Sequence, residues 1–157
     1  MNIFLDSDGV MADFEGHYLK LFNHECHTVP DKDMWKNIER YPSFFYDLPL
    51  FDGALDFYKT LKDYCFHYDH SLFILTACPR EHYALHATHK KNFYKDKVDP
   101  TVFVLPMISG KNKFLFMQNK EDILIDDFYK NIEGWSTAGG NAILFKNYDQ
   151  VLKEILK

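Results

Sequence analysis

The chain has 157 residues and a formal net charge of −5 at pH 7, with 46% hydrophobic and 26% charged residues. This share of apolar side chains excludes a disordered chain. The sequence contains no run of about 18 apolar residues, so no transmembrane helix is expected. Because dense clusters of Lys and Arg are lacking, we expect a small-molecule ligand and neither a nucleic-acid polymer nor a membrane as partner. Three scattered cysteines and the lack of a basic leader segment indicate a reducing cytoplasm.

Short apolar runs alternate with stretches of helical spacing along the chain. Five strands are expected, over residues 2–5, 71–75, 101–105, 122–125 and 142–145. Helices are expected over residues 14–22, from Pro79 to about Tyr94, and over 113–118. A further helix should begin after Asp52 as its N-cap, another should end at Gly139, and a last one should lie near the end of the chain. This alternation predicts an α/β, Rossmann-like fold with a mostly parallel sheet and helices on both faces.

The segment after the first strand differs from the rest, because it holds several prolines and many aromatic rings. We interpret residues 14–50 as a small, partly helical cap inserted after the first strand. The whole chain, 1–157, is then a single domain whose α/β core is formed by residues 1–13 and 51–157.

Polar side chains follow the predicted strands at the edge where such sheets bind ligands. The set comprises two acids after the first strand, a hydroxyl after the second, a lysine ahead of the fourth strand and an acidic pair after it: Asp6, Asp8, Thr76, Lys113, Asp126 and Asp127. Each residue alone is a common turn or cap residue, and Asp127 is expected to cap the following helix. Together they suit Mg²⁺, a phosphate group and nucleophilic attack by a carboxylate.

The motifs resemble those of the haloacid dehalogenase-like phosphohydrolases. FLDSDGVMADF resembles the first motif of that superfamily, LFILTACP the second and ILIDDF the fourth. Lys113 is the candidate for the third motif, with Lys111 as its rival. A closer resemblance is to the 5′(3′)-deoxyribonucleotidase branch, carried by DGVMADF and FFYDLPLFDGALDFYKTL. The segment KNIEGWSTAGGNAILF resembles the tail of the short phage and bacterial type.

The resemblance implies catalytic roles for the acids. Asp6 would be the nucleophile that forms an aspartyl-phosphate, and Asp8 the general acid and then the base that activates water. Asp6, the backbone carbonyl of Asp8, and Asp126 would bind Mg²⁺, with Asp127 as a secondary acid.

The resemblance also implies how a substrate is held. Four residues would contact the phosphate, namely Gly9, Thr76, Ala77 and Lys113. Phe44 and Phe45 of the cap would stack on a base, or would instead pack the cap onto the core. The implied activity is Mg²⁺-dependent hydrolysis of nucleoside monophosphates, with a sugar-phosphate phosphatase or a non-catalytic relative as alternatives.

Three positions depart from the family pattern. Ser7 replaces an apolar residue and is expected to point away from the ligand, and Ala77 replaces a phosphate-binding Ser. Leu85 aligns with a lysine that the family places in the helix after the second motif. His82, His86 and His89 are expected on the exposed side of that helix, and the pair Lys90 and Lys91 on the solvated surface.

Overall fold

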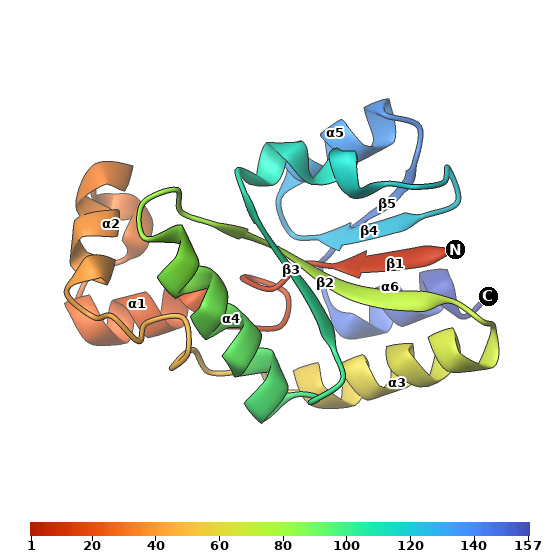
Figure 1. The fold of residues 1–157 in the computed structure, drawn as a ribbon, viewed down its shortest axis with the longest axis horizontal. Helices are drawn as coiled ribbons and strands as arrows, with labels where there is room; N and C mark the ends of the chain where they lie inside the picture. The colour runs from red at the N-terminus through yellow and green to blue at the C-terminus, as the bar shows by residue number, and fades with distance from the viewer.

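A five-stranded sheet forms the centre of the molecule, in a computed structural model that describes residues 1–157. The strands are β1 (Asn2–Leu5), β2 (Ser71–Cys78), β3 (Phe103–Ile108), β4 (Ile123–Asp126) and β5 (Asn141–Leu144). Their spatial order is β3-β2-β1-β4-β5 and every pairing is parallel (Figure 1). The α/β, Rossmann-like prediction is confirmed.

Helices cover both faces of the sheet. They are α1 (Phe14–Phe22), α2 (Asp31–Glu39), α3 (Ala54–His67), α4 (Tyr83–Lys97), α5 (Tyr129–Thr137) and α6 (Tyr148–Ile155), with two 3-10 helices, η1 (Cys26–Thr28) and η2 (Gly110–Phe116). Figure 1 shows α3 and α6 on one side of the sheet and α5 on the other. None of these helices combines the length and the apolar character needed to cross a bilayer.

Successive side chains of a strand point to opposite faces of the sheet, so each face of the sheet has its own hydrophobic cluster. Ile3 and Leu5 of β1 point into the larger cluster, which α3, α4 and α6 also supply. Phe4 points to the opposite face and packs against Trp135 of α5, with ring centroids 5.3 Å apart. Because both faces of β1 are buried, its sequence is a continuous apolar run.

The 14–50 segment lies beside the carboxyl ends of the strands and next to the N-terminal part of α4 (Figure 1). Asp13 caps α1 by accepting a hydrogen bond from the backbone N–H of Gly16 at 2.9 Å. Asn23, with a φ of 59°, ends α1 in the left-handed conformation typical of a helix C-terminus. The segment returns to the core where Asp13 N donates to Pro49 O and Phe51 N donates to Met11 O.

Several local predictions are wrong. The α4 helix begins at Tyr83 rather than at Pro79, because the chain first makes a turn that ends at His82 in the left-handed region. Asp52 forms no capping hydrogen bond with α3, which follows Gly53 at a φ of 82°. The helix expected over 113–118 is the 3-10 helix η2, and β2 continues past Thr76 to Cys78.

Candidate active site

Three carboxylates meet where β1 and β4 end. Asp6 follows β1 directly and its backbone N–H donates to Ile125 O at 2.9 Å, while Asp126 is the last residue of β4. One oxygen from each of Asp6, Asp126 and Asp127 lies within 4.8 Å of the others. Because β1 and β4 are neighbouring parallel strands, their carboxyl ends bring together residues that are 120 positions apart.

Lys113 is the cation of this cluster. Its Nζ lies 2.7 Å from Asp6 Oδ1 and 2.6 Å from Asp126 Oδ2, and its side chain is 2% exposed. Lys111, the rival candidate, is exposed. Burial opposes the charge on Lys113, but Asp6 and Asp126 outweigh it and raise the pKa of the lysine.

Asp6 is the acid whose charge is least satisfied. Burial raises its pKa to about 7, and the proximity of Asp126 acts in the same direction, while Lys113 opposes the shift. A second cation near Asp6 would favour the ionised carboxylate that nucleophilic attack requires.

Asp126 and Asp127 have different surroundings, although both belong to the group of carboxylates that could hold a metal ion. Asp126 is fully buried, and its oxygens accept hydrogen bonds from Lys113 Nζ, from Asn131 Nδ2 at 3.0 Å and from the backbone N–H of Phe128 at 2.8 Å. Asp127 is exposed to the cleft and does not cap α5, because the helix has no side-chain cap. Burial and then Asp126 raise the pKa of Asp127 to about 6. Asp127 is therefore the better candidate for the third metal ligand, and Asp126 holds Lys113.

Gly9 allows Asp127 to approach the loop after β1. The φ of Gly9 is 83°, and a Cβ at this position would lie 2.6 Å from Asp127 Cγ. A side chain at position 9 would cause both backbone strain and a steric clash with Asp127, which explains why this position is a glycine.

Asp8 lies two residues after Asp6 and has a lysine of its own, which the sequence analysis missed. Lys90 Nζ lies 2.8 Å from Asp8 Oδ2 and donates hydrogen bonds to Thr76 Oγ1 and Ala77 O, each at 2.8 Å. Lys90 is 1% exposed, so its expected surface position is wrong. Buried residues recur at helical spacing along α4, at His86, Ala87, Lys90, Phe93 and Tyr94, and this period could have revealed its position.

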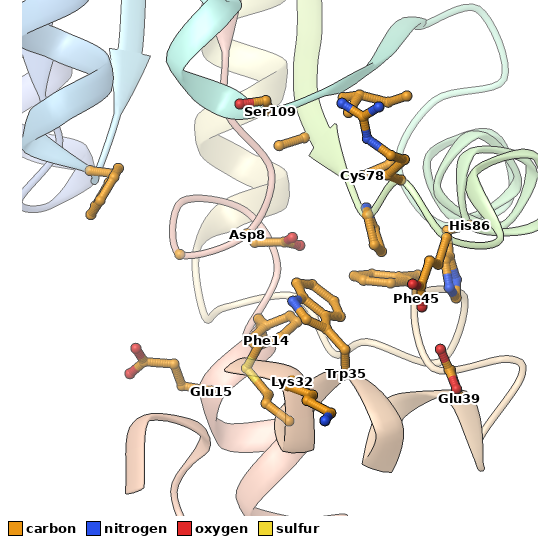
Figure 2. Close-up of a pocket in the computed structure, with 18 of the residues that line it drawn as sticks. Asp8, Phe14, Glu15, Lys32, Trp35, Glu39, Phe45, Cys78, His86 and Ser109 are labelled. Atoms are coloured by element: carbon orange, nitrogen blue, oxygen red, sulfur yellow. The ribbon is translucent and has the colours of Figure 1, made fainter. Parts of the chain in front are cut away.

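A cleft of about 1100 Å³ opens between the strand ends and the 14–50 segment. Asp8, Gly9, Ala77 and Asp127 line it on the strand side. Its opposite wall carries Phe14 and Trp35, and Figure 2 shows both rings projecting from the 14–50 segment into the cleft. Thr76 and Lys113 are buried just behind this surface.

The aromatic residues expected to contact a base differ in position. Phe44 is fully buried, packs on Phe14 and His17 and does not line the cleft, which contradicts a stacking role for it. Phe45 lines the cleft but is only 1% exposed, because it packs against His86 with ring centroids 5.0 Å apart (Figure 2). Trp35 is half-buried and offers the cleft more ring surface than either.

Ser7 is buried, which agrees with the expectation that it points away from the ligand. His86 is also buried, so its expected position on the exposed side of the helix is wrong. Ser7 Oγ accepts a hydrogen bond from Tyr94 OH at 2.7 Å and does not line the cleft. His86 lines the cleft, and burial, followed by the charges of its neighbours, lowers its pKa to about 4.

No family model and no curated protein matches the sequence. Among solved structures, the chain is similar to a hydrolase from Streptococcus pneumoniae TIGR4, with a TM-score of 0.61 and 13% identity over 99% of this chain and 98% of that chain. A HAD hydrolase, family IA, variant 3, from Entamoeba histolytica HM-1:IMSS gives a TM-score of 0.46 at 12% identity, over 97% of this chain and 88% of that chain. The first similarity establishes a shared fold over nearly the whole length of both chains.

Proposed function

We propose that this protein is a phosphatase of the haloacid dehalogenase-like type that hydrolyses nucleoside monophosphates through an aspartyl-phosphate on Asp6. The observation that carries the proposal is the pairing of Asp6 with the buried Lys113 beside Asp126 and Asp127. The motifs around these residues, and a fold shared with a hydrolase, support it.

Asp6 is the nucleophile in this proposal. A carboxylate oxygen of Asp6 attacks the phosphorus atom, forming an O–P bond while the bond from phosphorus to the leaving oxygen breaks. Lys113, 2.7 Å from Asp6 Oδ1, favours the ionised carboxylate before the attack and offsets negative charge on the phosphate during it. Preplaced positive charge of this kind is the main source of stabilisation in phosphoryl transfer.

Asp8 moves the proton. It donates a proton to the leaving oxygen in the first step and takes one from water in the second, when water attacks phosphorus and the bond to Asp6 breaks. Asp8 lines the cleft and one of its oxygens, Oδ1, is buried without a hydrogen-bond partner. That free oxygen is the one available for proton transfer.

The carboxylates fit Mg²⁺, which prefers one or two carboxylate ligands together with water and phosphate oxygens. Asp6, the backbone carbonyl of Asp8, and Asp127 would hold the ion, since the oxygens of Asp126 already accept three hydrogen bonds. When bound, Mg²⁺ would neutralise charge on Asp6 and on the substrate phosphate. The raised pKa values of Asp6 and Asp127 agree with a site suited to a cation.

The cleft suits a phosphate carried by an aromatic group. Its volume of about 1100 Å³ exceeds the several hundred Å³ typical of small-ligand pockets. Phe14 and Trp35 give the wall opposite Asp8 an apolar, aromatic character. Stacking of a base on such rings contributes on the order of 1–3 kcal/mol. We therefore favour a nucleoside over a sugar as the leaving group.

The test is phosphate release by the purified protein from a panel of nucleoside 5′- and 3′-monophosphates and sugar phosphates, with Mg²⁺ and with EDTA. We expect Mg²⁺-dependent release, fastest from nucleotides, and loss of at least about 10⁴-fold in Asp6→Asn. Trp35→Leu should raise the KM for nucleotides about tenfold and leave the KM for sugar phosphates unchanged. Absence of release from every monoester, or activity retained by Asp6→Asn, would contradict the proposal.

A further inference from the structure

The second buried lysine, Lys90, has a role that the proposed reaction does not yet use. Its ammonium group has three N–H donors, and three oxygens accept them: Asp8 Oδ2, Thr76 Oγ1 and Ala77 O, each at 2.8 Å. A lysine that is 1% exposed costs free energy unless its charge is paired and its donors are satisfied. The charge of Lys90 is paired with Asp8, and its three donors are satisfied by Asp8, Thr76 and Ala77, all of which belong to the candidate active site.

The direction of these hydrogen bonds determines which donor and acceptor atoms of Thr76 and Asp8 remain without a partner. An ammonium group can only donate, so Thr76 Oγ1 accepts from it and the hydroxyl proton of Thr76 is available to another acceptor. Asp8 accepts through Oδ2 and keeps Oδ1 without a partner. Lys90 therefore leaves one donor proton, on Thr76, and one acceptor oxygen, on Asp8, without a partner in the structure.

Lys90 is itself held rigidly. It lies on the buried face of α4, and the ring of Phe45 covers its Nζ at 4.6 Å from the ring centroid. One turn further along the same face, Tyr94 OH donates to Ser7 Oγ at 2.7 Å. The α4 helix thus holds the loop after β1 at two points, one at Ser7 and one at Asp8.

We propose that Lys90 is a positioning residue for the hydrolysis proposed above, on which this inference rests. It fixes Asp8 so that the free oxygen Oδ1 serves the leaving group, and it fixes Thr76 so that its hydroxyl proton points to the phosphate. Lys113 serves the nucleophile Asp6, and Lys90 serves the proton-transfer residue Asp8. Each acid of the first motif then has a separate buried lysine.

The test compares two substrates with different leaving groups. The leaving oxygen of a nucleoside monophosphate needs a proton, whereas p-nitrophenolate leaves without one. We expect Lys90→Met to lower kcat/KM for the nucleotide by about 100-fold, the low end of what a positioned general acid contributes. For p-nitrophenyl phosphate we expect kcat/KM to fall by only about tenfold, because this substrate needs no proton from Asp8 and is affected only through the position of Thr76. Asp8→Asn should show the same preference for the better leaving group.

The matched control is Lys91→Met, which removes the exposed neighbouring lysine and should leave both substrates unchanged. If Lys90→Met does not fold by circular dichroism, Lys90→Gln, which keeps a neutral donor, should give the same difference between substrates. A folded variant with unchanged rates, or with equal losses on both substrates, overturns the assignment of Lys90. A wild-type protein that releases no phosphate from either substrate overturns the proposed function as well.

Discussion

Aspartates lie at both ends of the parallel sheet, and the resolved pKa shifts have opposite directions at the two ends. At the carboxyl end, burial raises the pKa of Asp6 to about 7 and that of Asp127 to about 6. At the amino end, burial acts in the same direction on Asp99 and Asp122, but hydrogen bonds outweigh it and lower the pKa of both. The charges of Asp6 and Asp127 are thus poorly satisfied, whereas those of Asp99 and Asp122 are stabilised by hydrogen bonds.

The donors explain the difference. Asp122 accepts from the backbone N–H groups of Asn2, Gln118 and Asn119 at 2.8–3.0 Å and so ties the start of β1 to the loop before β4. Asp99 accepts from Tyr58, Lys62 and Thr101 between α3 and β3. Asp6 has a lysine and faces further negative charge. An acid with enough donors stabilises the fold, whereas one without them is ready for a cation or a phosphorus atom.

The largest expected effect comes from removing one acid at each end. Asp6→Asn should lower phosphatase activity by at least about 10⁴-fold but, at pH 7 without Mg²⁺, should not lower the free energy of unfolding, because the raised pKa of Asp6 means that its charge is poorly satisfied in the folded protein. Asp122→Asn should keep kcat and lower the free energy of unfolding by about 2–3 kcal/mol, because its backbone donors lose a charged acceptor. Steady-state kinetics and urea unfolding of both variants provide the measurement. Equal loss of stability in the two variants would contradict the comparison.

The acidic pair offers a finer comparison within the carboxyl end. Asp127→Asn should raise the Mg²⁺ concentration for half-maximal activity by about 10–100-fold, because it removes a metal ligand. Asp126→Asn should instead lower the free energy of unfolding by about 2 kcal/mol, because Lys113 and Asn131 lose their shared acceptor. Mg²⁺ titrations and urea unfolding separate the two. A larger Mg²⁺ effect in Asp126→Asn would restore the role first expected for that residue.

The pH dependence of stability should have opposite signs at the two ends. Between about pH 4 and pH 7, folded Asp6 holds a proton that the unfolded chain has lost, so its contribution to stability decreases as the pH rises through this range. Asp122 has a lowered pKa, so its contribution is lost only as the pH falls below about 4. We expect the stability of Asp6→Asn relative to wild type to increase from pH 5 to pH 7.5 in urea unfolding without Mg²⁺. Added Mg²⁺ should reduce this difference.

The smallest expected effect concerns His86, whose charged form is disfavoured by burial and by its basic neighbours. Its pKa is lowered to about 4, so between about pH 6.5 and pH 4 the unfolded chain binds a proton that the folded protein does not. The stability contributed by His86 is therefore lost on acidification. His86→Gln should lose less stability than wild type between pH 7 and pH 5. The exposed His67→Gln serves as the control, and it should follow wild type.

The fold and the acids could be predicted from the sequence because they depend on local patterns. The bounds of β1 and α1 match the expected residues, since one is an apolar run that ends at an acid and the other has helical spacing. Asp6, Asp8 and the acidic pair follow from the order of the strands. Helix starts were missed where backbone conformation decides them, as at Pro79 and Asp52.

The partners of these residues depend on tertiary packing and were harder to predict. Nothing in the pair Asp126-Asp127 indicates which acid will face Lys113, because that depends on how β4 ends against η2. Lys90 looked like a surface lysine beside Lys91. Phe44 and Phe45 are neighbours in sequence, yet only Phe45 reaches the cleft.

The central place of β1 also has a consequence for biosynthesis. Asp6 leaves the ribosome more than a hundred residues before Lys113 and β4. Until then Asp6, the proposed nucleophile, lacks Lys113 and its acidic neighbours in the nascent chain, and one edge of β1 has no strand to pair with. The three carboxylates and Lys113 therefore come together only in a single late event, when β4 pairs with β1.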